Sequence, residues 1–157
     1  MGSRGTGSRI HAMAMMMLAP VGSTTACGLD GGGSDIDGTM TAELAAYKAS
    51  WTVTPTACGS GEHQGFFGVD LIEGDREDAL IRVLLDPKDG YSLGINIPGE
   101  DMALFLGPDA GCELFDLELA RESSRVNDYW NVGGHALVDC SGPGIELHVD
   151  LVFSGCH

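Results

Sequence analysis

Short apolar runs with a period of two are the feature that most limits how this chain can fold. Seven such runs are bounded by turn-forming residues, and no long amphipathic helical pattern lies among them. They span residues 66–72, 79–85, 91–97, 102–106, 114–120, 129–139 and 145–153. Alternation of this kind places one face of a strand in a core and the other in water. The sequence therefore predicts an all-β fold: a single antiparallel β-sandwich or barrel-like domain over residues 40–157.

The segments between these runs contain proline and glycine, which favour tight turns. The segment DPKDG at residues 86–90 supplies a proline that presets φ and a glycine that tolerates positive φ, so a hairpin is expected there. The segment SGPG at residues 141–144 predicts the same between the last two runs, while GSGEH at 59–63 is interpreted as a loop with His63 exposed. Residues 40–51 contain helix-favouring Ala, Glu, Leu and Lys, but we expect two strands and a turn because their surroundings are β.

The last two runs place polar side chains on one face. If the turn centres between Gly142 and Pro143, His135 lies opposite Asp150 and Asp139 lies opposite Glu146, with His148 on the same face. Two imidazoles and carboxylates could bind a transition metal or form a base with its orienting partner. The exposed side of a half-buried hairpin is polar in any case, so a solvated face is favoured. We therefore assign no catalytic residue and expect no cofactor or metal, with His135, His148 and Asp150 as the candidates for an alternative.

Other motifs and the charge narrow the function classes. The chain has no H-E-x-x-H, P-loop, G-x-G-x-x-G or C-x-x-C pattern, which excludes the reactions and zinc folds that those motifs define. Its 23 acidic and 8 basic residues give a formal net charge of −15. From Cys27 onward all 23 acids but only six bases remain, a net charge of −17. A surface of that sign repels phosphates, so we expect no nucleic-acid partner.

Five cysteines are an odd number, and four of them form an even set once Cys27 is set aside. We predict the disulfides Cys112–Cys140 and Cys58–Cys156. Cys112 starts one strand and Cys140 ends the next, so the two meet at the open end of a hairpin. In the register above, Cys140 and Cys156 would stand roughly 35 Å apart, far beyond the Cα separation that a disulfide spans. Strand alternation places Cys112 and Cys140 on opposite faces, so a bulge near Gly111 is expected as well.

The N-terminal segment has the pattern of an export signal. Arg4 and Arg9 precede an apolar run at residues 12–18, which is far shorter than the roughly 20 residues that cross a bilayer, so no transmembrane helix is expected. The small residues before Cys27 resemble a bacterial lipobox, with Thr24 where leucine is usual. The resemblance implies a signal peptide over residues 1–26 and a lipidated Cys27. Residues 27–39, rich in Gly, Ser and Asp, are predicted to be a flexible linker.

As a whole the chain resembles small predicted lipoproteins of bacteria. The resemblance implies a lipid-anchored cell-envelope protein: an outer-membrane lipoprotein, or an extracellular or periplasmic one. The resemblance implies no particular activity; we interpret the chain as a binding or structural module whose partners are the membrane, through the anchor, and an envelope protein or extracellular ligand. A module of this kind should expose an aromatic patch, for which Trp51, Trp130 and Tyr129 are candidates. The alternative is a secreted or anchored hydrolase or metal-dependent enzyme with its site on the His135, His148 and Asp150 face.

Overall fold

The computed structural model describes residues 33–74 and 76–157, which form ten strands and two short 3-10 helices. The strands are β1 Asp35–Leu44, β2 Ala49–Val53, β3 Ala57–Ser60, β4 Gly68–Glu73, β5 Arg76–Asp86, β6 Gly90–Asn96, β7 Ala103–Leu106, β8 Leu114–Val126, β9 Tyr129–Gly142 and β10 Ile145–Cys156. The 3-10 helices are η1 Gly61–Gln64 and η2 Pro108–Ala110. Among these described residues, no helix has the length and hydropathy that a membrane crossing requires. The predicted signal peptide and Cys27 lie outside the described residues.

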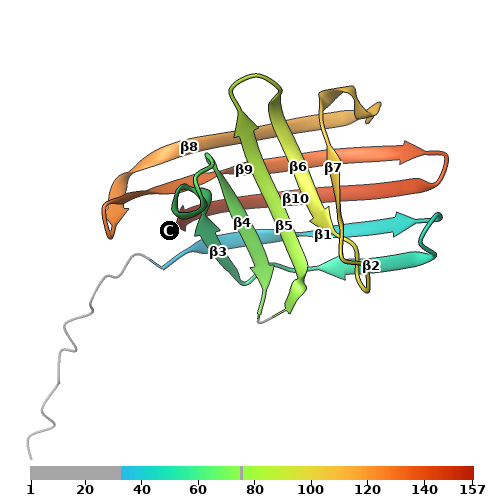
Figure 1. The fold of residues 1–157 in the computed structure, drawn as a ribbon, viewed down its shortest axis with the longest axis horizontal. Coiled ribbons are helices and arrows are strands. Elements are labelled where there is room, and N and C mark those ends of the chain that lie inside the picture. Colours follow the sequence, from blue (N-terminus) through green and yellow to red (C-terminus); the bar gives the residue numbers. More distant parts are fainter. Residues whose placement is uncertain (1–32, 75) are drawn as a thin grey trace, which may run out of the picture.

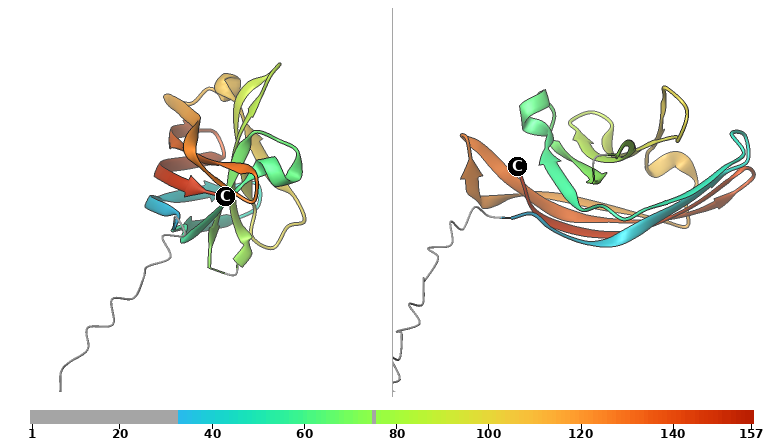
Figure 2. Two further views of the ribbon diagram at one scale, coloured as in Figure 1. Left: turned by 90° about the vertical axis from the view of Figure 1, so that its left-hand side faces the viewer. Right: turned by 90° about the horizontal axis from the view of Figure 1, so that it is seen from below.

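Two antiparallel sheets of five strands pack face to face, as the sequence predicts. Sheet A has the strand order β2-β1-β10-β9-β8, and sheet B has the order β3-β4-β5-β6-β7. The strands of sheet A are long and bowed, and the shorter strands of sheet B lie on its concave side, crossing them at a steep angle (Figures 1 and 2). Such crossed packing is one of the two ways in which twisted sheets bury a common core.

The core lies between the two sheets and follows the period-two pattern. Along β10, Leu147, Val149 and Leu151 are at most 2% exposed, while the residues between them face water. Sheet B contributes a matching set of fully buried aliphatic side chains: Val69, Leu71, Ile81, Val83, Leu93 and Ile95. The alternation that predicts the strands therefore also fixes which face of each strand is buried.

The predicted linker overlaps the first strand, and this part of the prediction is wrong. Strand β1 begins at Asp35, so residues 35–39 pair with β10 rather than forming a linker. Gly38 lies opposite Leu151 with φ of +109°, and a Cβ at this position would collide with the carbonyl oxygen of Asp150. A glycine that composition alone places in a linker is therefore required in the sheet, because another strand approaches its backbone closely.

Two other short segments show where local pattern is reliable and where it is not. Residues 40–51 form β1, a turn and most of β2, which confirms two strands despite the helix-favouring composition. Strand β3 was not predicted, since its four residues ACGS carry no alternation that would distinguish them from a loop. It exists because it pairs with β4, with Cys58 opposite Leu71.

The hairpin between β9 and β10 has a register different from the predicted one. Gly142 pairs with Ile145, so the turn centres on Pro143 and Gly144, one residue later than expected, and Gly144 has φ of +89°. Consequently His135 lies opposite Val152, and His148 lies opposite Asp139. A displacement of one residue in the turn changes the pairing by two residues, so each side chain keeps its predicted face.

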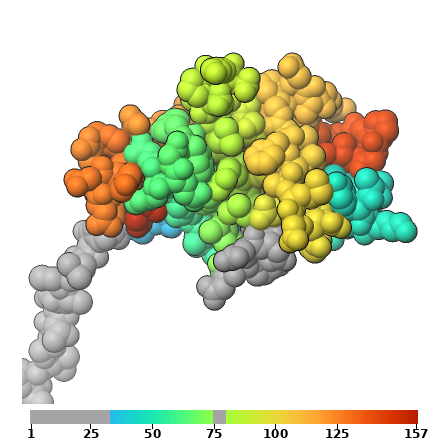
Figure 3. All heavy atoms as spheres, viewed as in Figure 1, coloured from blue at the N-terminus to red at the C-terminus, as the bar shows by residue number. Residues whose placement is uncertain are grey.

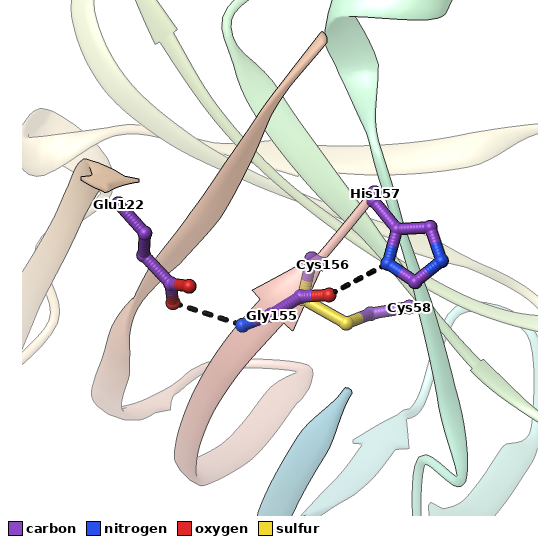
Figure 4. The surroundings of a disulfide bond; sticks show 5 residues. All are labelled: Cys58, Glu122, Gly155, Cys156 and His157. Atoms are coloured by element: carbon purple, nitrogen blue, oxygen red, sulfur yellow. Dashed lines mark hydrogen bonds between the residues drawn. A yellow bond between two sulfur atoms is a disulfide. The ribbon is translucent and has the colours of Figure 1, made fainter. Parts of the chain in front are cut away.

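Both predicted disulfides are present. Cys112 and Cys140 lie 4.1 Å apart at Cα and link the segment before β8 to β9, and Cys58 and Cys156, 5.1 Å apart, link sheet B to the end of β10. Cys112 precedes β8 instead of lying in it, and Gly111 at φ of +77° redirects the chain, so the expected bulge is not needed. Beside Cys156, the amide of Gly155 donates a hydrogen bond to Glu122 Oε1 at 2.8 Å, and the ring of His157 hydrogen-bonds the Gly155 carbonyl (Figure 4).

Candidate functional site

The polar face predicted from the sequence is the outer face of sheet A, and it is open. His148, Asp139 and Glu146 border one shallow hollow of about 360 Å³, while His135 borders another of about 580 Å³. Asp150 is exposed and borders neither. Because His148 lies opposite Asp139, four residues along β9 from His135, the two imidazoles are separated by roughly 13 Å along the strands. The structure therefore does not bring the five predicted residues into one pocket.

Each histidine has its own acidic neighbours. His135 Nε2 lies 3.2 Å from Asp116 Oδ2, its Nδ1 lies 3.7 Å from Glu118 Oε2, and both carboxylates are more than half exposed. His148 Nδ1 lies 4.0 Å from Asp139 Oδ2. In the described part of the chain, no group of three or more His, Cys, Asp or Glu side chains is arranged to hold a metal ion. These pairs are exposed electrostatic contacts between neighbouring strands.

We expect the purified chain to retain no stoichiometric zinc, because neither histidine shares a coordination sphere with the other. Metal analysis after exhaustive dialysis measures this directly, with a His135→Ala/His148→Ala double variant as the control. Stoichiometric metal in the wild type that disappears in the double variant would contradict the expectation and favour the metal-dependent enzyme.

A third hollow, of about 390 Å³, was not predicted from the sequence. It lies at the end of the sandwich where η1 meets the tip of the β8–β9 hairpin, and these two segments are side by side in Figure 3. We call it the aromatic hollow and define it by its lining residues: Glu62, Gly65, Phe66, Phe67, Arg121 and Tyr129. It is a shallow, open depression like the two on sheet A, but three of its six lining residues are aromatic.

A charged pair lies in this hollow. Glu62 Oε1 accepts hydrogen bonds from Arg121 Nε at 2.8 Å and lies 2.6 Å from Arg121 Nη2. The second oxygen of Glu62 accepts the backbone amide hydrogen of Trp130 at 3.3 Å. The Arg121 side chain is 57% exposed and that of Glu62 only 15%, so the guanidinium faces solvent while the carboxylate is held beneath it. The pair thus presents the donors of a fixed guanidinium to solvent beside the aromatic residues of the hollow.

A second pair of opposite charge lies next to the hollow, on the outer face of sheet B. Asp70 on β4 accepts hydrogen bonds from Arg82 Nε at 2.6 Å and Nη2 at 2.7 Å, and from Gln64 Nε2 at 3.0 Å. Asp70 is only 6% exposed although it lies on an outer face, because Arg82 and Gln64 cover it. The hydrogen bond from Arg82 to Asp70 raises the pKa of the guanidinium, so Arg82 stays charged.

The aromatic side chains around the hollow are held in place. The ring of Phe66 lies across Gly61 and Gly68, where any Cβ would collide with it, and Arg82 stacks on it at 4.6 Å. At the rim, the rings of Tyr129 and His63 are 3.8 Å apart. Such contacts fix ring orientation before any ligand arrives.

The three aromatic residues that the sequence suggested for an exposed patch have different environments. Tyr129 is 36% exposed and borders the hollow. Trp130 is half-buried under Arg125, whose guanidinium lies 3.6 Å from the ring, and Trp51 is half-buried against the core. The one sequence signal that could have indicated the hollow is the pair Phe66–Phe67, which breaks the alternation just after a loop with a carboxylate.

Fold and site together define a disulfide-linked, all-β, two-sheet protein with an aromatic hollow at one end. A scan against protein-family models, a search of curated proteins and a search of solved structures each found no match to this chain.

Proposed function

We propose that this protein is a lipid-anchored cell-envelope protein that acts as a binding module, and that the aromatic hollow is its ligand site. The observation that carries the binding role is the hollow itself, where aromatic walls surround a fixed pair of opposite charges, Glu62 and Arg121. Binding sites combine these two elements, since apolar walls supply affinity and a few placed polar groups supply orientation. The wide separation of His135 and His148 on an open face favours a module over a hydrolase.

The cysteine pairing supports the anchor. Two disulfides occupy Cys58, Cys112, Cys140 and Cys156, which leaves Cys27 as the fifth cysteine with none of those four as a partner. Disulfides persist in oxidising compartments such as the periplasm and the cell surface, which agrees with export.

The position of the hollow agrees with a role at the envelope. The tip of the β8–β9 hairpin and η1 lie at the end of the sandwich where β1 begins (Figure 1). Gly33 is six residues after Cys27, and six extended residues span at most roughly 20 Å. An anchor at Cys27 would therefore keep this end of the sandwich close to the membrane surface.

Lipidation is tested by the mass of the membrane-extracted protein. We expect a chain that starts at Cys27 and carries additional acyl mass, and we expect a Cys27→Ala variant to lose its membrane association. A soluble product with a free thiol at Cys27 would contradict the anchor.

The binding role is tested by retention of envelope extract on the immobilised protein, with Tyr129→Ala as the variant and Tyr47→Ala as the control. Tyr47 is a good match because it is 39% exposed and lies in the β1–β2 turn, away from the hollow.

A further inference from the structure

The aromatic hollow restricts the charge of its ligand. Arg121 is neutralised by Glu62 at 2.6 Å, and the chain from Cys27 onward carries a net charge of −17, so an anionic ligand would be repelled. A cationic ligand would meet the exposed guanidinium of Arg121 before the carboxylate, which is 15% exposed and already accepts three donors. The electrostatics therefore favour a neutral ligand.

The hydrogen-bonding groups restrict it further. A purely apolar ligand would remove the Glu62–Arg121 pair from water without replacing those interactions, which costs free energy. A ligand with adjacent hydroxyls avoids this cost, because its hydroxyl oxygens can accept hydrogen bonds from the exposed guanidinium of Arg121. Tyr129 is 36% exposed at the rim of the hollow, so its ring additionally favours a ligand with an apolar C–H face.

A neutral pyranose ring has these properties together: vicinal hydroxyls around its edge and an apolar face of C–H groups. We propose that the aromatic hollow binds a neutral saccharide, with Tyr129 contributing ring contact and Arg121, held by Glu62, donating hydrogen bonds to a vicinal diol. This inference rests on the proposed binding role of the hollow and adds the chemical class of its ligand.

Direct binding is measured by tryptophan fluorescence. The chain has two tryptophans, and the backbone amide of Trp130 is bonded to Glu62, so a Trp51→Phe variant leaves Trp130, next to the hollow, as the single reporter. The probes are cellohexaose, maltohexaose and N-acetylchitohexaose, added to the full-length chain. We expect at least one to bind with a Kd of roughly 0.01–1 mM, the range of an exposed site, and hexagalacturonate to bind at least about tenfold more weakly because it is anionic.

Variants separate the site from the rest of the surface. In the Trp51→Phe background, Tyr129→Ala and Arg121→Gln should each weaken saccharide binding about tenfold, whereas Tyr47→Ala should change it less than about twofold. Tyr129 and Arg121 are both exposed, so unchanged thermal midpoints would show that the fold persists. Equal weakening by Tyr47→Ala, or tighter binding of the anionic probe, would overturn the inference.

Periodate, which cleaves vicinal diols, separates failure of this inference from failure of the proposed function. Retention of envelope extract that depends on Tyr129 and is abolished by periodate treatment of the extract supports both. Retention that depends on Tyr129, resists periodate and is destroyed by proteinase overturns the saccharide inference and leaves the binding role standing. Absence of both Tyr129-dependent retention and saccharide binding overturns both.

Discussion

Replacing Cys58 and Cys156 together with alanine should lower the free energy of unfolding by up to about 4.7 kcal/mol. This disulfide closes a loop of 98 residues, and in the chain-entropy model a longer loop restricts the unfolded chain more. It also joins β3 of sheet B to β10 of sheet A, and Cys156 is fully buried. Against a typical stability of roughly 5–15 kcal/mol, such a loss would leave the fold marginal. Urea denaturation followed by circular dichroism measures it.

The second disulfide provides the matched control. Cys112–Cys140 closes 28 residues, so alanine at both positions should cost no more than about 3.6 kcal/mol. The double variant at Cys58 and Cys156 should therefore be the less stable of the two. The reverse order, or a Cys140–Cys156 peptide in a non-reducing digest, would contradict the pairing or its energetic account.

Replacing Arg82 with methionine should destabilise the protein by about 3 kcal/mol. The substitution keeps the aliphatic stem but removes the two shortest hydrogen bonds to Asp70, which is 6% exposed and is left with Gln64 as a donor. An uncompensated buried carboxylate costs roughly 3–5 kcal/mol, and the 28% exposure of the Arg82 side chain places the expected loss at the lower end.

Two further variants test this explanation. Arg121→Met also removes an arginine bound to a carboxylate, but Arg121 is 57% exposed, so the loss should be about 1 kcal/mol or less. Adding Asp70→Leu to Arg82→Met should restore most of the lost stability, because the uncompensated carboxylate is gone. If the double variant were less stable than Arg82→Met alone, the burial of an unpaired charge would not be the cause.

Much of the fold could be predicted because it depends on neighbours in the chain. Leu147, Val149 and Leu151 alternate with polar residues and are buried in that order. The DPKDG turn forms as expected, with Asp86 Oδ1 accepting the amides of Lys88 and Asp89. The disulfide pairing also followed from chain order, since Cys112 and Cys140 lie at the open end of one hairpin.

Where composition was used in place of pattern, the prediction was weaker. Residues 35–39 have the composition of a linker, yet they belong to β1 because β10 offers them a partner. Strand β3 has no alternation of its own and is defined by β4. The polar face of β9 and β10 was placed on the correct side, but its pairing was two residues out because the turn centres one residue later.

Most strands, their buried faces, the antiparallel sandwich and the two disulfides could be predicted from the sequence, because period-two alternation and turn chemistry act over a few residues. The aromatic hollow could not, because it depends on tertiary contacts. Glu62 reaches Arg121 across 59 residues and the amide of Trp130 across 68, and no local pattern encodes either contact. The aromatic hollow exists because the crossed sheets bring η1 and the tip of the β8–β9 hairpin to the same end, so its geometry is a property of packing.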